Sequence, residues 1–201
     1  MQTQAMHFKS RASMKLADVR LQKNLKKLSE KFVTARAAAI AELDDFEATR
    51  EAAVERRNLA LSRLDVWLDT FERNAAARGA TVLYAESHEE ACRLIVDIGR
   101  KHGVTKATKS KSMVSEEIGL NKALAAAGIQ PVETDLGEYI LQINDNEPPS
   151  HIIAPVIHKD KEEISDLFAR MHGTARKTEI TDLTGEARAV LRSHFLSADM
   201  G

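Results

Sequence analysis

The sequence predicts an α/β protein in which an N-terminal arm of long helices precedes a mostly parallel sheet with flanking helices. Residues 12–78 contain no glycine and no proline. After Gly79, short apolar segments alternate with amphipathic ones, which is typical of strands alternating with helices. Aromatic residues make up only 4% of the 201 residues, so aliphatic side chains are expected to build most of the core.

The helical arm is expected to span residues 1–78. Apolar residues recur at steps of three and four from Leu21 to Leu43 and again from Val54 to Ala75, which places each series on one face of a helix. The pattern loosens around Asp44–Arg50, where a break is expected. Two long helices that pack on each other or on the body follow from this spacing, and a dimerising coiled coil has too few heptads. Gly79 is expected to end the second helix, because glycine accepts left-handed dihedrals.

The body, residues 79–201, is expected to alternate strands with helices. Strands are expected at 81–85, 104–108, 129–134, 139–143 and 152–156, and helices at 88–102, 112–128, 160–171 and 184–197. Ser87 and Ser112 can cap the first two of these helices. Val114, Ile118 and Leu124 are expected on the inner face of the second. Pro155 fits the end of a strand or an edge strand.

Composition excludes several classes of protein. The net charge of −1 argues against a nucleic-acid-binding protein as a whole. No apolar run approaches the roughly 20 residues that a membrane span requires, and no secretory signal is visible. The single cysteine, Cys92, excludes an internal disulfide framework and is expected to be a buried, inert thiol. These observations predict a cytoplasmic location.

Charge is distributed unevenly along the chain. Residues 1–40 carry nine Lys/Arg against two Asp/Glu, which gives +7, whereas residues 80–201 carry 14 against 19, which gives −5. Such a basic arm can dock on an acidic partner or on its own body. A solvated helix face is the alternative.

Two polar segments are the principal candidates for a ligand site. Lys109–Ser112 is expected where a strand leads into a helix N-terminus, which favours an anion. Asp135–Tyr139 is expected after the next parallel strand, so both segments would lie at the same edge of the sheet, where open α/β sheets commonly bind ligands. The candidate residues for a small carboxylate or anion are Lys109, Ser110, Lys111, Ser112, Asp135, Glu138 and Tyr139, with His158 and Lys159 beside them. The alternative is a Ser112 cap, solvated lysines and a turn at Asp135 and Gly137.

The remaining histidines give weaker signals. His151 and His158 flank the last expected strand, seven positions apart, so they would point to opposite faces and lie roughly 20 Å apart. A shared metal site is therefore not expected, and no metal ligands are assigned. The spacing indicates no Ser/His/Asp nucleophile arrangement and no nucleotide-binding glycine motif.

Three segments resemble the lactate-utilisation protein B family: KATKSKSMVSEEIGLNKALAAAGIQPVETDLGEYILQI, PPSHIIAPVIHKDKEEI and the terminal FLSADMG. The resemblance runs from about residue 65 to 201 and is looser in the N-terminal helices. Members of this family are bacterial iron–sulfur proteins with an N-terminal LUD domain. The resemblance implies a NagB/RpiA/CoA-transferase-like fold. It also implies an electron-transfer subunit that works with other subunits of a lactate-utilisation complex to oxidise L-lactate to pyruvate.

This chain departs from the family pattern in its cysteines. The full-length family carries cysteine-rich motifs for 4Fe-4S clusters, and Cys92 matches none of them. Because each cubane cluster normally needs four thiolates, no cofactor is expected in this chain. The chain resembles the amino-terminal part of a longer protein, truncated within the LUD domain, and is expected to be inactive and poorly stable alone. A non-catalytic assembly module and, by fold analogy only, a CoA- or acyl-transfer enzyme are the alternatives.

Overall fold

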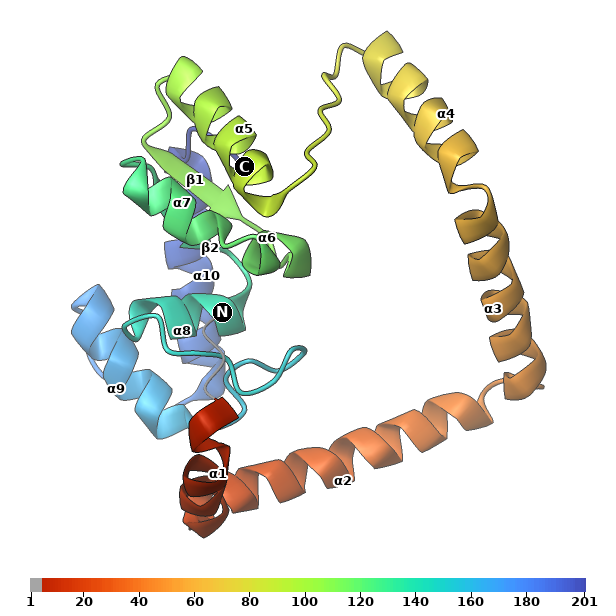
Figure 1. Ribbon diagram of the computed structural model, residues 1–201. Coiled ribbons are helices and arrows are strands. Elements are labelled where there is room, and N and C mark those ends of the chain that lie inside the picture. Colours follow the sequence, from red (N-terminus) through yellow and green to blue (C-terminus); the bar gives the residue numbers. More distant parts are fainter. Residues whose placement is uncertain (1–4) are drawn as a thin grey trace. The chain divides into compact units, whose positions relative to one another are not determined.

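The computed structural model describes residues 5–201 (Figure 1). The chain folds into two compact units. One unit contains the described residues up to Leu28 together with Glu86–Gly201, and the other contains Ser29–Ala85. The division into 1–78 and 79–201 that we infer from the sequence stays a prediction.

The described part of the arm is helical, as predicted. It forms the 3-10 turn η1 (Ala5–His7) and the helices α1 (Phe8–Ala17), α2 (Val19–Ala41), α3 (Phe46–Ser62) and α4 (Leu64–Ala77). The expected break lies before α3, where the Asp45 side chain accepts a hydrogen bond from the Ala48 N–H at 2.9 Å. Further breaks at Asp18 and Arg63 were not predicted. Gly79, at φ +85°, follows the end of α4 in the left-handed region.

The unit that contains Glu86–Gly201 is built around a small parallel sheet. Its elements are α5 (His88–Lys101), β1 (Lys106–Lys109), α6 (Met113–Glu117), α7 (Leu120–Ala126), β2 (Gln130–Glu133), α8 (Leu136–Ile143), α9 (Lys161–His172) and α10 (Ile180–Ser197). β1 and β2 pair in parallel, with Lys106 opposite Gln130 and Lys109 opposite Glu133; both strands are labelled in Figure 1. The other edge of β1 carries a parallel bridge from Ala107 to Met200. This arrangement confirms the predicted α/β class with parallel strands.

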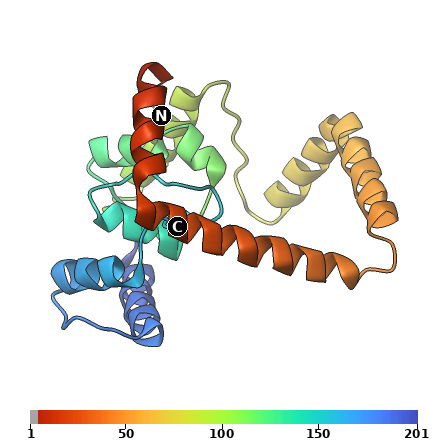
Figure 2. The ribbon, with the colours of Figure 1, turned by 90° about the horizontal axis from the view of Figure 1, so that it is seen from below.

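Two clusters of buried side chains form the core of this unit. The first joins α5, β1 and α7 through Cys92, Val96, Ala107, Leu120, Leu124 and Ile129. The second joins α8, α9 and α10 through Ile140, Leu167, Phe168, Leu183 and Ala187, and Figure 2 shows α9 and α10, in blue, lying side by side. The core is mainly aliphatic, as the composition predicted, although Phe168 is among its most deeply buried side chains.

Three predicted strands are wrong. Residues 81–85 have no strand partner among the described residues. Residues 139–143 lie in α8, because Asp135 caps a helix start and the apolar run is short enough to form either a buried helix or a strand. Residues 152–156 form a loop in which Ile152 and Ile153 are exposed, and Pro155 cannot donate a ladder hydrogen bond.

The predicted helix 112–128 is two helices. Gly119, at φ +72°, separates α6 from α7, and this left-handed turn carries Val114 to an exposed position instead of the inner face. Leu124 is buried in the first core cluster as predicted, and Ile118 is half-buried beside it. The expected turn at Asp135 and Gly137 is instead the first turn of α8.

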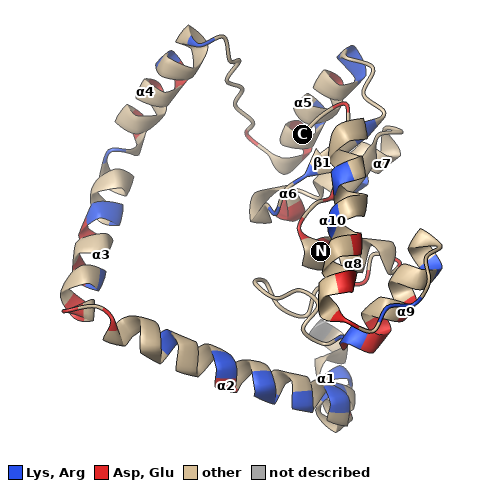
Figure 3. Ribbon diagram, turned by 180° about the vertical axis from the view of Figure 1, so that it is seen from behind, with Lys and Arg blue, Asp and Glu red and all other residues tan. Residues whose placement is uncertain are grey.

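Basic residues line the first helices. Lysines and arginines gather along α1 and α2 (Figure 3). Arg20 contacts two carboxylates of the acidic body, with distances of 3.6 Å to Asp160 and 2.9 Å to Glu163. These ion pairs connect the basic arm to the acidic body.

Among the described residues, no helix is both long enough and apolar enough to cross a membrane.

The outer edge of β2 is closed by one side chain. Gln142 accepts a hydrogen bond from the Glu133 N–H at 3.0 Å and donates to the Pro131 carbonyl at 2.9 Å. These are the groups that a further strand would pair. The amide of Gln142 therefore satisfies two main-chain groups of a strand edge that would otherwise be open.

Gln142→Ala is expected to lower the free energy of unfolding by about 1–3 kcal/mol, because both main-chain groups lose their partner. Urea denaturation followed by circular dichroism measures the loss. Gln130→Ala removes the same amide from an exposed position on β2 and serves as the matched control. Equal stability of the two variants would contradict the role of Gln142.

Candidate functional site

Lys109 lies at the carboxyl end of β1 with its side chain mostly buried. Its Nζ lies 2.8 Å from Oε1 of Glu133, the residue opposite it on β2, and donates to Oγ of Ser115 at 3.1 Å. The Asn121 side chain donates to the same carboxylate oxygen at 2.6 Å. The register of the sheet therefore pairs the charge of Lys109 with a buried carboxylate.

Lys111 connects the two predicted segments. Its Nζ lies 3.3 Å from Oε1 of Glu138 and 3.7 Å from Oδ2 of Asp135. Asp135 also caps α8 by accepting from the Glu138 N–H at 3.4 Å. Ser112 caps α6 by accepting from the Ser115 N–H at 3.2 Å, and Ser110 is exposed. The segments thus meet at the sheet edge as expected, while ligand binding there stays a prediction.

Acidic groups outnumber basic ones at this edge. Glu116 lies near the cluster, and burial, followed by the charge of Glu138, raises its pKa, although Lys109 and Lys111 act in the opposite direction. Oε2 of Glu133 is buried with no hydrogen-bond partner among the described residues. Since carboxylates compensate both lysines, an anion at this edge would have to displace an existing ion pair.

Tyr139 belongs to a different, buried network. Its hydroxyl lies 3.0 Å from Nε2 of His172, whose Nδ1 lies 2.8 Å from Oε1 of Glu186. Thr174 donates to the same oxygen at 2.7 Å, and Nζ of Lys177 lies 2.8 Å from Oε2, close enough for an ion pair although its angles are not those of a hydrogen bond. Burial raises the pKa of Tyr139, and the charge of Glu186 adds to the effect.

The carboxylate of this network stays ionised. Burial by itself would raise the pKa of Glu186, but the ion pair with Lys177 and the hydrogen bonds with Thr174 and His172 outweigh it and lower the pKa to about 2. Glu186 therefore anchors the network as a charged group at neutral pH. Sequence reasoning missed both Glu186 and His172, because they lie far from Tyr139 in the chain.

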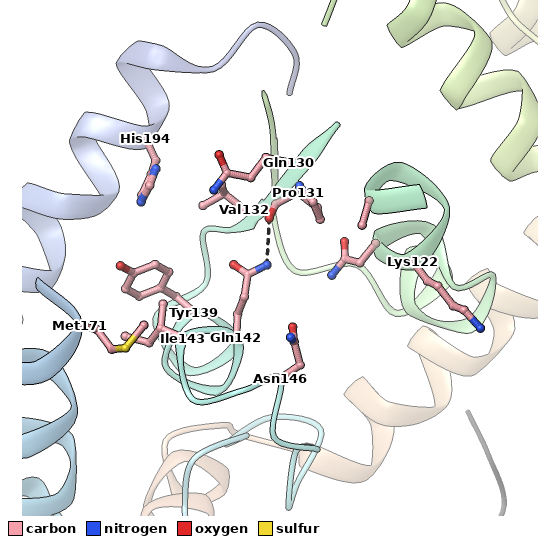
Figure 4. A pocket seen from close by; sticks show the side chains of 12 residues that line it. Lys122, Gln130, Pro131, Val132, Tyr139, Gln142, Ile143, Asn146, Met171 and His194 are labelled. Carbon is pink, nitrogen blue, oxygen red and sulfur yellow. Dashed lines mark hydrogen bonds between the residues drawn. The ribbon is translucent and has the colours of Figure 1, made fainter. Parts of the chain in front are cut away.

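A cavity of about 740 Å³ lies beside β2 (Figure 4). Tyr139 and His194 line one end, and Lys122 lies on the opposite side of the view, with neutral amides and apolar side chains between them. Burial lowers the pKa of His194, and the charges of Lys106 and His172 lower it further. No aspartate or glutamate is among the described residues that line the cavity, so its electrostatics suit a neutral or anionic ligand.

His158 and Lys159 lie in the segment before α9 and contact a third carboxylate. Nζ of Lys159 lies 2.6 Å from Oε2 of Glu147, and Nε2 of His158 lies 2.9 Å from Oε1. Nδ1 of His158 lies 2.5 Å from Oγ of Ser150. Sequence reasoning missed Glu147 and Ser150, because it placed a strand between Ser150 and His158.

The residues of this chain do not fit an iron–sulfur cluster. Cys92 is its only cysteine, its thiol donates to the Ile118 carbonyl at 3.3 Å, and burial, followed by the charge of Glu89, raises its pKa. A cubane requires four thiolates. Among the described residues, no group of three or more His, Cys, Asp or Glu side chains is arranged to hold a metal ion.

Comparison with known proteins identifies the family. The LUD domain family matches residues 68–201. Lactate utilization protein B of Bacillus licheniformis is 43% identical over 194 residues, which is 96% of this chain and 41% of the relative. The protein of the same name from Lysinibacillus sphaericus is 40% identical over 201 residues, 100% of this chain and 42% of the relative. That of Geobacillus kaustophilus is 45% identical over 166 residues, 83% of this chain and 35% of the relative.

The chain thus spans about two fifths of the length of the first two of these relatives. No solved structure matches it. The match to the family covers both strands of the sheet and every helix from α5 to α10. The chain belongs to the LUD domain family.

Proposed function

We propose that this chain is the amino-terminal part of an iron–sulfur electron-transfer subunit that takes part in the oxidation of L-lactate to pyruvate. The observation that carries the proposal is the 40–45% identity to proteins named Lactate utilization protein B over 83–100% of the chain. Since Cys92 cannot hold a cluster, the 4Fe-4S clusters would be bound outside this segment. Partner subunits of a lactate-utilisation complex and a cytoplasmic location are part of the same proposal.

Two places are available for a small carboxylate within this proposal. The first is the sheet edge with Lys109 and Lys111, where acidic side chains already pair both lysines. The second is the cavity beside Tyr139, where Lys122 has no ion pair among the described residues and no carboxylate contributes to the lining. Because an anion gains more from an uncompensated charge, the charge balance favours the cavity.

Deletion of the gene tests the proposed role. The deletion strain is expected to lose oxidation of L-lactate. It should still grow on pyruvate, because the missing step is the one that forms pyruvate from lactate. The intact gene should restore lactate oxidation. Unchanged L-lactate oxidation in the deletion strain would contradict the proposal.

Complementation with variants tests the cavity. Lys122→Ala is expected to reduce the rate of L-lactate oxidation at limiting lactate more than at saturating lactate, since it weakens binding. Lys101→Ala removes the same charge from an exposed site on α5 that lines no described cavity and is the control. Equal rates in the two strains would exclude Lys122 as a carboxylate ligand.

A further inference from the structure

The segment between α8 and α9 brings a serine, a histidine and a glutamate into one hydrogen-bonded chain. Oγ of Ser150 lies 2.5 Å from Nδ1 of His158, and Nε2 of the same ring lies 2.9 Å from Oε1 of Glu147. A nucleophile, a base within hydrogen-bond reach and a group that orients the base are the three parts of an activated nucleophile. We propose that Ser150 is a nucleophile that accepts an acyl group from a neutral or cationic ester or thioester, with His158 as its base. This inference does not depend on the proposed role in lactate oxidation.

The hydrogen bonds determine the roles of the two ring nitrogens. A carboxylate only accepts, so Nε2 carries the hydrogen that is donated to Glu147. In the neutral ring, Nδ1 is then unprotonated and accepts from the hydroxyl of Ser150. The two nitrogens exchange the roles that they have in serine proteases, but the order of nucleophile, base and carboxylate is the same.

Glu147 is held in its charged form. Burial would raise its pKa, but hydrogen bonds from Lys159 and Asn144, both at 2.6 Å to Oε2, together with the charges of Lys159 and His158, lower it. Its other oxygen, Oε1, remains directed to His158. A fixed carboxylate stabilises the imidazolium that forms when His158 takes the serine proton.

The loop that carries Ser150 is closed by its own hydrogen bonds. The Ser150 N–H donates to the Pro155 carbonyl at 3.1 Å. The N–H groups of Ile153 and Ala154 donate to Nδ1 of His151 at 3.1 and 3.2 Å. A nucleophile that is already positioned loses less entropy on reaction.

Unpaired donors follow the nucleophile directly. Among the described hydrogen bonds, none uses the backbone N–H groups of His151 or Ile152. They are the donors nearest to Ser150 in the chain for the oxygen of a tetrahedral intermediate, which requires such N–H groups for its stabilisation.

A cavity of about 460 Å³ opens at Ser150 and determines the class of substrate. Met113, Pro149 and Ile152 supply apolar walls, and Glu116, Glu117 and Glu138 supply carboxylates. No lysine or arginine is among its described lining residues. Lys111 pairs with Glu138, but Glu116 and Glu117 have no ion pair among the described residues, so carboxylate-bearing or phosphorylated acyl donors would be repelled and a neutral or cationic donor fits.

The proposed step conserves atoms and charge. Oγ attacks the carbonyl carbon as its proton moves to Nδ1 of His158, and the bond from that carbon to the leaving oxygen or sulfur then breaks. The leaving group takes the proton from His158, which leaves Ser150 acylated. Water repeats the sequence and releases the carboxylic acid.

An uncharged alkyl fluorophosphonate is the probe for the nucleophile. The Ser150 Oγ–P bond forms, the P–F bond breaks and fluoride leaves. We expect a stoichiometric adduct that peptide mass spectrometry places on Ser150 of the intact protein. Labelling should disappear in Ser150→Ala and fall roughly a hundredfold or more in His158→Gln, because a general base contributes about 10²–10⁴-fold.

Ser87→Ala removes an exposed helix-cap serine and should leave the labelling unchanged. Circular dichroism checks that each variant is folded. Absence of an adduct on Ser150 in the folded protein, or a labelling rate that does not depend on His158, overturns the proposal.

Two esters test the class of substrate. p-Nitrophenyl acetate should acylate the protein at least about tenfold faster than p-nitrophenyl succinate, because the second carries a carboxylate into a cavity that Glu116 and Glu117 make negative. The difference should shrink at high salt. Equal rates for the two esters would overturn the assignment of a neutral or cationic donor.

Discussion

Glu186→Gln is expected to lower the free energy of unfolding by about 3 to 5 kcal/mol at pH 7. The carboxylate is almost inaccessible to solvent and faces His172, Thr174 and Lys177. A neutral amide cannot balance the charge of Lys177, and its NH₂ group cannot accept a hydrogen bond. Urea denaturation monitored by circular dichroism measures the loss. Glu162→Gln, on the exposed face of α9, is the control and should differ from the wild type by less than about 0.5 kcal/mol.

The same carboxylate predicts a dependence of stability on pH. The pKa of Glu186 in the folded protein is about 2, below its ordinary value of 4.5. A lowered pKa contributes stability above the unfolded value, and this contribution is lost as the pH falls towards the folded value. The wild type should therefore lose about 3 kcal/mol between about pH 5 and pH 2 through this group alone.

Glu186→Gln lacks this carboxylate, so the difference in the free energy of unfolding between the variant and the wild type should become smaller as the pH falls from about 5 to 2. Urea denaturation of both proteins at pH 7, 4 and 2.5 would measure this difference. A gap that stays constant with pH would mean that the charge of Glu186 does not stabilise the fold.

Lys109→Met is expected to lower the free energy of unfolding by about 3 to 5 kcal/mol, an effect as large as that of Glu186→Gln. It leaves Glu133 charged and buried, with the Asn121 amide as the remaining donor at Oε1 and no partner at Oε2. Thermal or urea denaturation at pH 7 would measure the loss.

A double variant identifies the cause. Lys109→Met combined with Glu133→Met removes both charges and should recover most of the stability, because apolar residues can replace a buried ion pair. Lys101→Met on the exposed face of α5 is the control. If Lys109→Met is as stable as this control, Lys109 is not required for the fold, and its role as a ligand residue becomes the better explanation.

Helices and caps were predicted well, because their signals are local. The three- and four-residue spacing of the arm, the Ser87 cap of α5 and the Ser112 cap of α6 each depend on residues within one or two turns. The strands at 106–109 and 130–133 were also close to prediction, since each is a short segment between a glycine-terminated helix and a polar stretch.

The candidate site was predicted only in part. The parallel register was enough to bring Lys109–Ser112 close to Asp135 and Glu138. The sequence did not reveal that Glu133 lies directly opposite Lys109, nor that the first turn of α8 directs Glu138 towards Lys111. Tyr139 was placed with the sheet edge by its position in the chain, but the helical turn of α8 directs it to His172.

By itself, the sequence determined the helical arm, the α/β class and the family of this protein, because periodicity, helix caps and the segments that resemble the family lie within short stretches of chain. Only the tertiary structure decided whether 139–143 and 152–156 are strands, since a short apolar run takes the conformation that its neighbours can bury and pair. The loop conformation of residues 152–156 also brings Ser150, His158 and Glu147 into one hydrogen-bonded chain. An extended strand would hold Ser150 and His158 far apart, whereas the closed loop before α9 brings them within hydrogen-bond distance.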